Sequence, residues 1–236
     1  MYGRQVEERI LDFGHSGRLY KNGFVLYDFQ TQSLWTHVTG EAIYGELKGK
    51  KLQRATGILV TPRISFSDWR KQFPHTKVLS VNGRSERQND FTEYLKKTNW
   101  WAGMTPPIKD QRVSLKTLII GIVAASGPRA YARELFDKRQ ILIDKALKPP
   151  VIIFYDASSG AAAAYRTELD GRSLEFSSEV RNFTIQDSTT NSTWHLLKGK
   201  AIAGELNGTA LTPVPLVEMF WGAWADYHPK TYLHGH

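Results

Sequence analysis

The segment from Asp28 to Leu52, DFQTQSLWTHVTGEAIYGELKGKKL, decides the fold, because it recurs without a gap from Asp187 to Leu211 as DSTTNSTWHLLKGKAIAGELNGTAL. The two copies are identical at 12 of 25 positions, and the spacing between matching residues is constant. Chance does not produce such agreement, and an internal repeat constrains the whole architecture. We therefore expect two related structural units.

The repeat continues on both sides of this block. Upstream, Leu11-Asp12-Phe13 aligns with Leu174-Glu175-Phe176, and downstream Trp69 matches Trp224. The second copy has a long segment before its upstream strand, from about Leu115, whereas the first copy has only the short stretch that starts at Met1. We expect the first unit to be truncated at its N-terminus. Either the chain is a fragment or has a mis-assigned start, or a partner chain supplies the missing strands by strand addition.

Short β-branched and aromatic runs separated by turn residues predict antiparallel strands. The run Val151–Tyr155 ends at Asp156-Ala157-Ser158-Ser159-Gly160, and the pairs Asp170-Gly171 and Asn207-Gly208 suit two-residue type I′ hairpin turns. We predict a mainly β protein, a β-rich α+β fold of two related antiparallel β-meander units with short helices. Residues 1–80 would form the first, incomplete unit, 81–113 a connector and 114–236 the second unit. The two units could also pack as one compact pseudo-symmetric domain.

Helical periodicity is limited to short stretches, at 65–73, 217–227, 85–100 and part of 130–147. In the first of these, Phe66, Trp69 and Phe73 recur at i, i+3 and i+7, which places them on one helical face. We expect that face to close the end of a sheet.

Composition excludes several classes of function. The formal net charge is +8, which favours anionic partners. The basic residues nevertheless form no run of five or six like charges, and no dedicated nucleic-acid readout motif is present. We therefore do not expect nucleic acid as a partner. The chain has no cysteine, which excludes disulfides, thiolate catalysis and cysteine-ligated metal sites within it.

Targeting and membrane signals are also absent from the sequence. Residues 1–11 lack the apolar core of a signal peptide. The longest apolar stretch, 117–125, is too short to span a bilayer, so we expect no transmembrane segment. The default expectation is a cytoplasmic protein, which a truncated start would leave open.

Several segments resemble the DUF3179 family, a group of prokaryotic proteins of unknown function. They are Phe13-Gly14-His15-Ser16-Gly17, Tyr27-Asp28, Gly40-Glu41-Ala42-Ile43 and, in the second half, Phe154-Tyr155-Asp156 and Phe220-Trp221-Gly222-Ala223-Trp224. Members of that family usually carry a hairpin with a Cys-Pro-Leu-Cys-like sequence ahead of the Phe-Gly-x-Ser-Gly segment, which would be a place for metal or redox chemistry. This chain lacks that region, so thiol-based activity cannot be carried over to it.

Residues that occur in both copies are interpreted as structural, because two copies seldom keep one binding site twice. The paired tryptophans would be core anchors, and the paired aspartates would bond the backbone of their own turns. Glu46 and Glu205 would face water or pair with a nearby lysine. The anchors are Asp28, Trp35, Gly45, Trp69, Asp187, Trp194, Gly204 and Trp224.

Residues that the copies do not share remain for function, and the weak candidates for ligand binding are His15, Ser16, His37 and His195. His15 and Ser16 belong to a Gly-His-Ser-Gly segment that we expect to form a turn. Its spacing is not that of a nucleophile elbow, and the histidines have no recognised metal-ligand spacing. We assign no catalytic residue and no metal ligand, and the cofactor stays unknown.

The leading hypothesis is a non-enzymatic binding or scaffolding module, with a protein partner that covers an open sheet edge. A metal-binding or redox-associated protein is the alternative, and an electrostatic nucleic-acid binder is the third.

Overall fold

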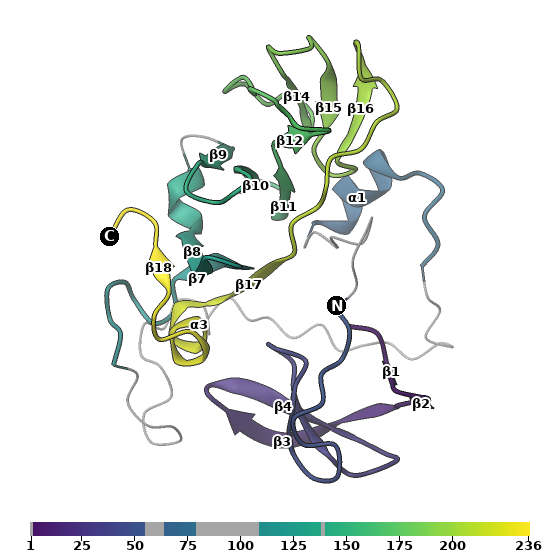
Figure 1. The fold of residues 1–236 in the computed structure, drawn as a ribbon, viewed down its shortest axis with the longest axis vertical. Helices are drawn as coiled ribbons and strands as arrows, with labels where there is room; N and C mark the ends of the chain where they lie inside the picture. The colour runs from purple at the N-terminus through teal and green to yellow at the C-terminus, as the bar shows by residue number, and fades with distance from the viewer. Residues whose placement is uncertain (1, 55–63, 79–108, 138–139) are drawn as a thin grey trace.

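The computed structural model describes residues 2–54, 64–78, 109–137 and 140–236. Over these residues the protein is mainly β, as predicted, with small antiparallel sheets and two short α-helices (Figure 1). The helix predicted at 85–100 and most of the connector predicted at 81–113 lie outside the described residues. No helix in the described part of the chain is long and apolar enough to cross a membrane.

The first unit opens with a two-stranded hairpin and continues as a four-stranded antiparallel meander in the order β3-β4-β5-β6. Alternation along the meander turns Leu26 and Trp35 towards a core that also contains Val6 and Leu11. Helix α1 (Phe66–Gln72) follows. The strands are β1 (Gln5–Val6), β2 (Arg9–Ile10), β3 (Phe13–Tyr20), β4 (Gly23–Asp28), β5 (Leu34–Thr36) and β6 (Ala42–Tyr44).

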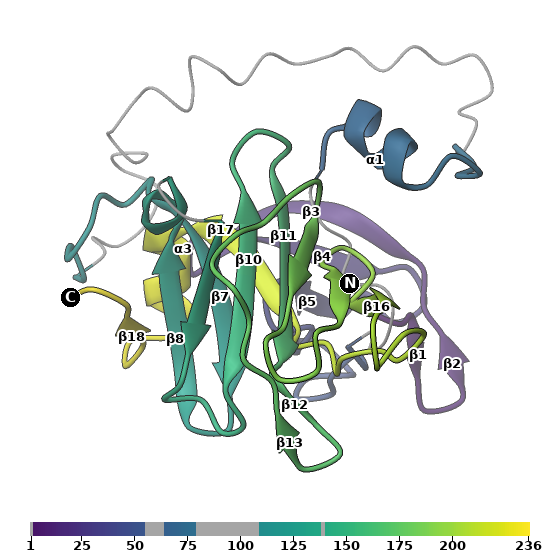
Figure 2. The same ribbon diagram turned by 90° about the horizontal axis from the view of Figure 1, so that it is seen from above.

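The second unit repeats this meander as β14-β15-β16 and adds two sheets, in the orders β11-β10-β9 and β17-β7-β8-β18. Figure 2 shows β7 and β8 beside the β10–β11 hairpin. The elements are β7 (Leu118–Ala124), β8 (Gly127–Ala132), the 3₁₀ turn η1 (Arg133–Phe136), β9 (Ile141–Asp144), β10 (Val151–Asp156), β11 (Ala161–Arg166), β12 (Glu168–Leu169), β13 (Arg172–Ser173), β14 (Thr184–Gln186), β15 (Thr193–His195), β16 (Lys200–Ala203), β17 (Leu216–Phe220), α3 (Trp221–Tyr227) and β18 (Tyr232–Leu233).

Two of the predicted helical stretches are wrong in extent. Residues 217–220 belong to β17, and α3 begins only at Trp221. The stretch 130–147 contains the end of β8, a single 3₁₀ turn and β9. In both places pairing with a buried strand outweighs helical periodicity, since β17 pairs with β7 and β9 pairs with β10.

The two predicted type I′ turns have different outcomes. Asp170 and Gly171 both have positive φ, at 50° and 76°, as this turn requires. At the second place Gly208 has φ 90°, while Asn207 is not among the residues with positive φ. The prediction of a type I′ turn at Asn207-Gly208 is therefore wrong.

The structural repeat extends further towards the N-terminus than the sequence comparison indicates. The hairpin β1–β2 of the first unit corresponds to β12–β13 of the second. Leu11 donates its backbone N–H to the Arg4 carbonyl over 2.9 Å, and Leu174 does the same to the Thr167 carbonyl over 2.8 Å. The correspondence reaches Tyr2, whose hydroxyl bonds the Val38 carbonyl as that of Tyr165 bonds the Leu196 carbonyl.

Each helix contacts the meander of the other unit at its C-terminal end. Helix α1 lies beside the second meander (Figure 1), where Gln72 Oε1 is 3.0 Å from His195 Nε2. Helix α3 reaches the first meander, where the Tyr227 hydroxyl is 2.6 Å from Thr36 Oγ1 and donates to the Tyr20 carbonyl over 2.9 Å. The exchange of helices joins the two units.

Candidate functional site

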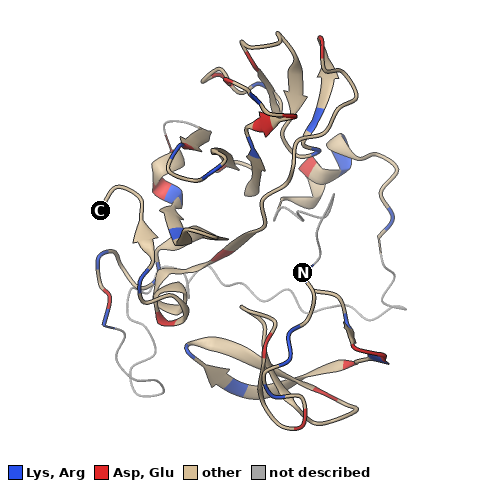
Figure 3. Ribbon diagram, viewed as in Figure 1, with Lys and Arg blue, Asp and Glu red and all other residues tan. Residues whose placement is uncertain are grey.

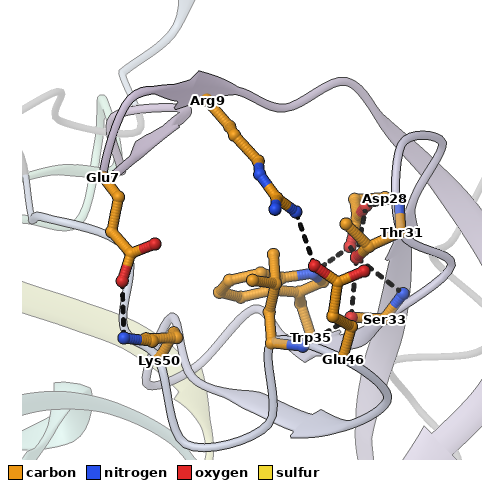
Figure 4. A network of polar contacts seen from close by, with 9 residues as sticks. Glu7, Arg9, Asp28, Thr31, Ser33, Trp35, Glu46 and Lys50 are labelled. Atoms are coloured by element: carbon orange, nitrogen blue, oxygen red, sulfur yellow. Dashed lines mark hydrogen bonds and ion pairs between the residues drawn. The ribbon is translucent and has the colours of Figure 1, made fainter.

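A network centred on Asp28 closes the turn between β4 and β5 (Figure 4). Asp28 accepts hydrogen bonds from the Thr31 backbone N–H over 2.5 Å, the Thr31 hydroxyl over 2.9 Å and Trp35 Nε1 over 2.8 Å. Burial raises the pKa of Asp28, but the bonds from Trp35 and Thr31 outweigh it and hold the pKa below its ordinary value. The carboxylate is fully engaged in holding this turn.

The same network recurs around Asp187. This carboxylate accepts from the Thr190 backbone N–H over 2.6 Å and from Trp194 Nε1 over 2.7 Å. Both tryptophans are buried, Trp35 at 1% and Trp194 at 0% exposure. Such agreement between the two copies indicates a structural device.

The paired glutamates and glycines also have matching surroundings. Both glutamates face water, which was one of the two expectations. Glu46 pairs with Arg9 over 2.6 Å and Glu205 with Arg172 over 2.8 Å, so the partner is an arginine rather than the lysine of the other expectation. Gly45 and Gly204 have φ of 94° and 88°. A Cβ at these glycines would lie 2.7 Å and 2.5 Å from the serine Cα beneath them, which only glycine avoids.

The four predicted ligand candidates do not form one site. The ring of Phe24 lies between two histidines, stacked on His37 at 3.7 Å and tilted against His15 at 5.6 Å. Burial lowers the pKa of His37, against a hydrogen bond to the Phe24 carbonyl. His195 lies in the second unit against Gln72. In the ranges that the structure describes, no three His, Asp, Glu or Cys side chains are placed to hold a metal ion.

Ser16 lies in a bulge of β3 and not in a turn, which corrects the expectation for this segment. The register between β3 and β4 shifts between His15 and Leu19, and Gly17 has φ 70°. The Ser16 hydroxyl donates to the Val25 carbonyl over 2.6 Å and accepts from the Arg18 backbone N–H over 3.2 Å. The hydroxyl stabilises the bulge.

A hollow of about 330 Å³ opens on the first meander next to this bulge. Its floor is a row of directly paired residues that crosses the sheet from β3 to β6, namely Gly14, Tyr27, Leu34 and Tyr44. Residues paired in this way share one face of a sheet. The bulge contributes one side, and the described lining is His15, Ser16, Arg18, Tyr27, Gln32, Leu34 and Tyr44.

The second meander has a hollow at the equivalent place, of about 610 Å³, but its lining is polar. Gln186 stands where the first unit has Tyr27, Thr193 replaces Leu34, and Ala203 replaces Tyr44. The lining is Ser177, Ser178, Glu179, Arg181, Thr184, Ile185, Gln186 and Thr193. The aromatic floor therefore distinguishes the first unit from the second.

Tyr27, Tyr44 and Arg18 were missed by sequence reasoning. They lie on three different strands, and only the register brings them together. For the two tyrosines the signal was a difference between the copies, since Tyr27 aligns with Gln186 and Tyr44 with Ala203.

A second surface that differs between the units is the outer side of α1. We define the α1 face as Phe66, Trp69 and Val78. Phe66 is 56% and Val78 69% exposed, while Trp69 is partly exposed. Their counterparts in the second unit, Trp221, Trp224 and Leu233, are each 0% exposed.

The local geometry of the two helices is otherwise alike. Trp69 Nε1 donates to the Thr76 hydroxyl over 2.7 Å, and Trp224 Nε1 donates to the Thr231 hydroxyl over 2.9 Å. The cap residues Phe73 and His228 have φ of −134° and −130°. The difference between the helices lies in what covers them.

Charged groups are mixed rather than segregated. Figure 3 shows Lys and Arg interspersed with Asp and Glu along both units. In the first unit several basic side chains are in ion pairs, which are Arg4–Asp12, Arg9–Glu46, Lys50–Glu7 and Lys51–Glu41. The net charge of the chain is thus not concentrated at the hollow.

The fold defines a class: a mainly β protein with two repeated antiparallel meanders and short helices. A family model described as "Protein of unknown function (DUF3179)" matches residues 1–231. The chain therefore belongs to the DUF3179 family. No curated protein and no solved structure matches the chain.

Proposed function

We propose that this protein is a non-enzymatic binding module whose protein partner supplies a β-hairpin that covers the α1 face. The observation that carries the proposal is the contrast between α1 and α3. None of the described residues of α1 is buried, whereas five of the seven residues of α3 are. An apolar helix face left at the surface is typical of an interaction site.

The repeat itself indicates what chemistry fits there. In the second unit the Trp224 ring lies over Gly121 of β7, where a Cβ would come within 2.3 Å of the ring. Gly121 pairs directly with Ala130 of β8, and both strands contribute to the cluster that buries α3. The surface that accepts this tryptophan is thus a pair of small residues, Gly121 and Ala130, on two adjacent strands of a hairpin. We infer the same surface in the partner.

The surroundings of the α1 face favour a reversible complex. Where α3 has Ala223 and Ala225, α1 has Asp68 and Arg70. Asp68 also pairs with Lys71 over 2.9 Å. An apolar centre with a charged rim is the usual anatomy of interfaces between proteins that also exist apart.

The test uses a hairpin that already accommodates the equivalent helix within this chain. A cyclised, fluorescein-labelled peptide of residues 117–132, which contains β7 and β8, is titrated with the full chain and followed by anisotropy. Cyclisation is needed because an isolated two-stranded hairpin is marginally stable. We expect saturable binding that weakens about tenfold in Trp69→Ala, as loss of a central aromatic anchor implies.

Two controls make the result specific. Tyr44→Ala removes an exposed ring from a different surface and should leave binding unchanged. A peptide carrying Gly121→Leu should not bind, because its side chain would occupy the space of the tryptophan ring. Absence of binding at about 1 mM, or equal binding by the two peptides, contradicts the proposal.

A further inference from the structure

The hollow on the first meander is a second binding site with its own chemistry. We propose that it binds an extended saccharide chain, whose rings stack on Tyr27 and Tyr44 and whose hydroxyl groups bond Arg18 and Gln32. This site is separate from the α1 face, and it does not depend on the protein partner.

The first argument is that the two copies of the repeat have different residues on the floor of the hollow. Both units keep the Asp–Trp hydrogen bond, the Arg–Glu ion pair and a hollow on the meander. The second unit shows that Gln, Thr and Ala suffice on the floor of such a hollow. The tyrosines at 27 and 44 are therefore not required by the meander, which points to a ligand.

The second argument is that Tyr27 is held in place before any ligand arrives. Its ring lies against the β3 backbone at Gly14, where a Cβ would come within 2.8 Å of the ring. Phe29 packs against it edge-to-face with ring centroids 4.9 Å apart. A ring that is fixed in this way costs little conformational entropy on binding.

The third argument is the spacing of the two rings. Tyr27 on β4 and Tyr44 on β6 are separated by one strand, so their backbones lie about 10 Å apart. Leu34 lies between them, and Tyr44 is 67% exposed. Two apolar platforms at this separation suit an extended chain of rings, in which alternate sugar units turn the same C–H face to one side. A small isolated molecule would be poorly enclosed here.

The polar lining fits the edges of sugar rings. Arg18, Gln32 and His15 offer planar donors and acceptors, and no carboxylate stands among the described residues of the lining. The Ser16 hydroxyl is already engaged in the bulge and is not counted among the ligand-binding groups. An acidic sugar would be tolerated, because the guanidinium of Arg18 can pair with its carboxylate.

Single-stranded nucleic acid also stacks on aromatic rings, but the charges favour the saccharide. Binding a phosphate chain needs several cations along its path. Among the lining residues that the structure describes, Arg18 is the one Lys or Arg. Other basic groups of this unit, Arg4, Arg9, Lys50 and Lys51, are paired with carboxylates.

The experiment is a titration of the full chain by calorimetry with four probes, which are cello-hexaose, chito-hexaose, a hexamer of galacturonate and oligo-dT. We expect at least one oligosaccharide to bind. Tyr44→Ala should weaken that binding about fivefold, the order expected for one stacked ring. Tyr27→Phe should retain it, because the stacking face is kept.

The matched control is Gln186→Ala in the second unit, which stands at the position of Tyr27 and should leave the affinity unchanged. Thermal melting of each variant verifies that it is folded. Failure of all three oligosaccharides to bind, or binding that Tyr44→Ala leaves intact, overturns the proposal. Binding of oligo-dT alone, with a steep salt dependence, would assign the site to nucleic acid and would equally overturn it.

Discussion

Gln72 and His195 stand in contact at the same two positions of the repeat as Tyr227 and Thr36. In the first pair Oε1 lies 3.0 Å from Nε2, and in the second the two hydroxyl oxygens are 2.6 Å apart. The residue types have changed completely while the contact has been kept. In both units, therefore, the end of the helix contacts the meander of the other unit.

The Tyr227 contact gives the first prediction. Tyr227→Phe keeps the ring but removes the hydrogen bonds to Thr36 and to the Tyr20 carbonyl. We expect the free energy of unfolding to fall by about 1 kcal/mol, because the partly buried Thr36 hydroxyl loses its partner, whereas the exposed Tyr20 carbonyl can bond water instead. Urea denaturation measures the change. An unaltered midpoint would mean that α3 is held by its apolar contacts alone.

Stability should depend on pH through His195. Burial and then the charge of Lys198 lower its pKa below the ordinary value of about 6.5. Below that pH the unfolded chain binds a proton that the folded chain resists, so stability falls as the pH decreases. We expect a lower melting temperature at about pH 5.5 than at about pH 7.5.

The variant His195→Gln tests this assignment, since it keeps a polar side chain opposite Gln72 but cannot titrate. The difference in melting temperature between the two pH values should shrink in the variant. An identical difference in both proteins would place the pH dependence elsewhere, for instance at His37, whose pKa burial also lowers.

The two aspartate networks should contribute equally to the free energy of unfolding. Asp28→Ala leaves Trp35 Nε1 and the Thr31 N–H without their acceptor, and Asp187→Ala does the same to Trp194 and Thr190. Each change should cost about 2–4 kcal/mol, the sum of two buried donors left unsatisfied. Chemical denaturation of both variants checks the value. A cost in only one unit would argue against a shared structural role.

The glycines supply a comparison within the repeat. Gly45→Ala and Gly204→Ala drive a Cβ into serine backbone atoms at 2.7 Å and 2.5 Å. Gly49 and Gly208 have similar φ, at 87° and 90°, but a Cβ there meets nothing within 4 Å. Alanine at 49 or 208 should lower the free energy of unfolding by about 1 kcal/mol, from backbone strain alone. Alanine at 45 or 204 should lower it further, because the Cβ also clashes with the serine backbone. Lower melting temperatures for the variants at 45 and 204 than for those at 49 and 208 would support this contrast. Equal melting temperatures in all four variants would contradict it.

Much of the architecture was predictable because it is local and repeated. Identical residues at a constant spacing predicted the two meanders, and the turn at Asp170-Gly171 follows from backbone preferences. The correspondence of Arg9 with Arg172 was also within reach, because each lies two residues before the aligned Leu11 and Leu174. The spacing differs there from that of the core block because the first copy is longer between Phe13 and Asp28 than the second is between Phe176 and Asp187. Part of 130–147 was predicted to be helical, and there the pairing of β9 with β10 leaves only the 3₁₀ turn η1.

The candidate sites depended more strongly on tertiary structure. No sequence pattern places Tyr27 beside Tyr44, since strand register alone sets which residues share a row. In contrast, the helical face of Phe66, Trp69 and Phe73 was predictable from periodicity. Its partial exposure became apparent only by comparison with the buried α3.

The exchanged helices have a consequence for how such a protein can evolve and be divided. A gene split between the two units would yield two polypeptides, each with a meander that has lost its contact with the other unit's helix, Gln72 for the second meander and Tyr227 for the first. We expect the two products to carry matching recognition surfaces and to reconstitute on mixing. The reciprocal contact therefore couples the two copies even where their residues have diverged, as at His195 and Thr36.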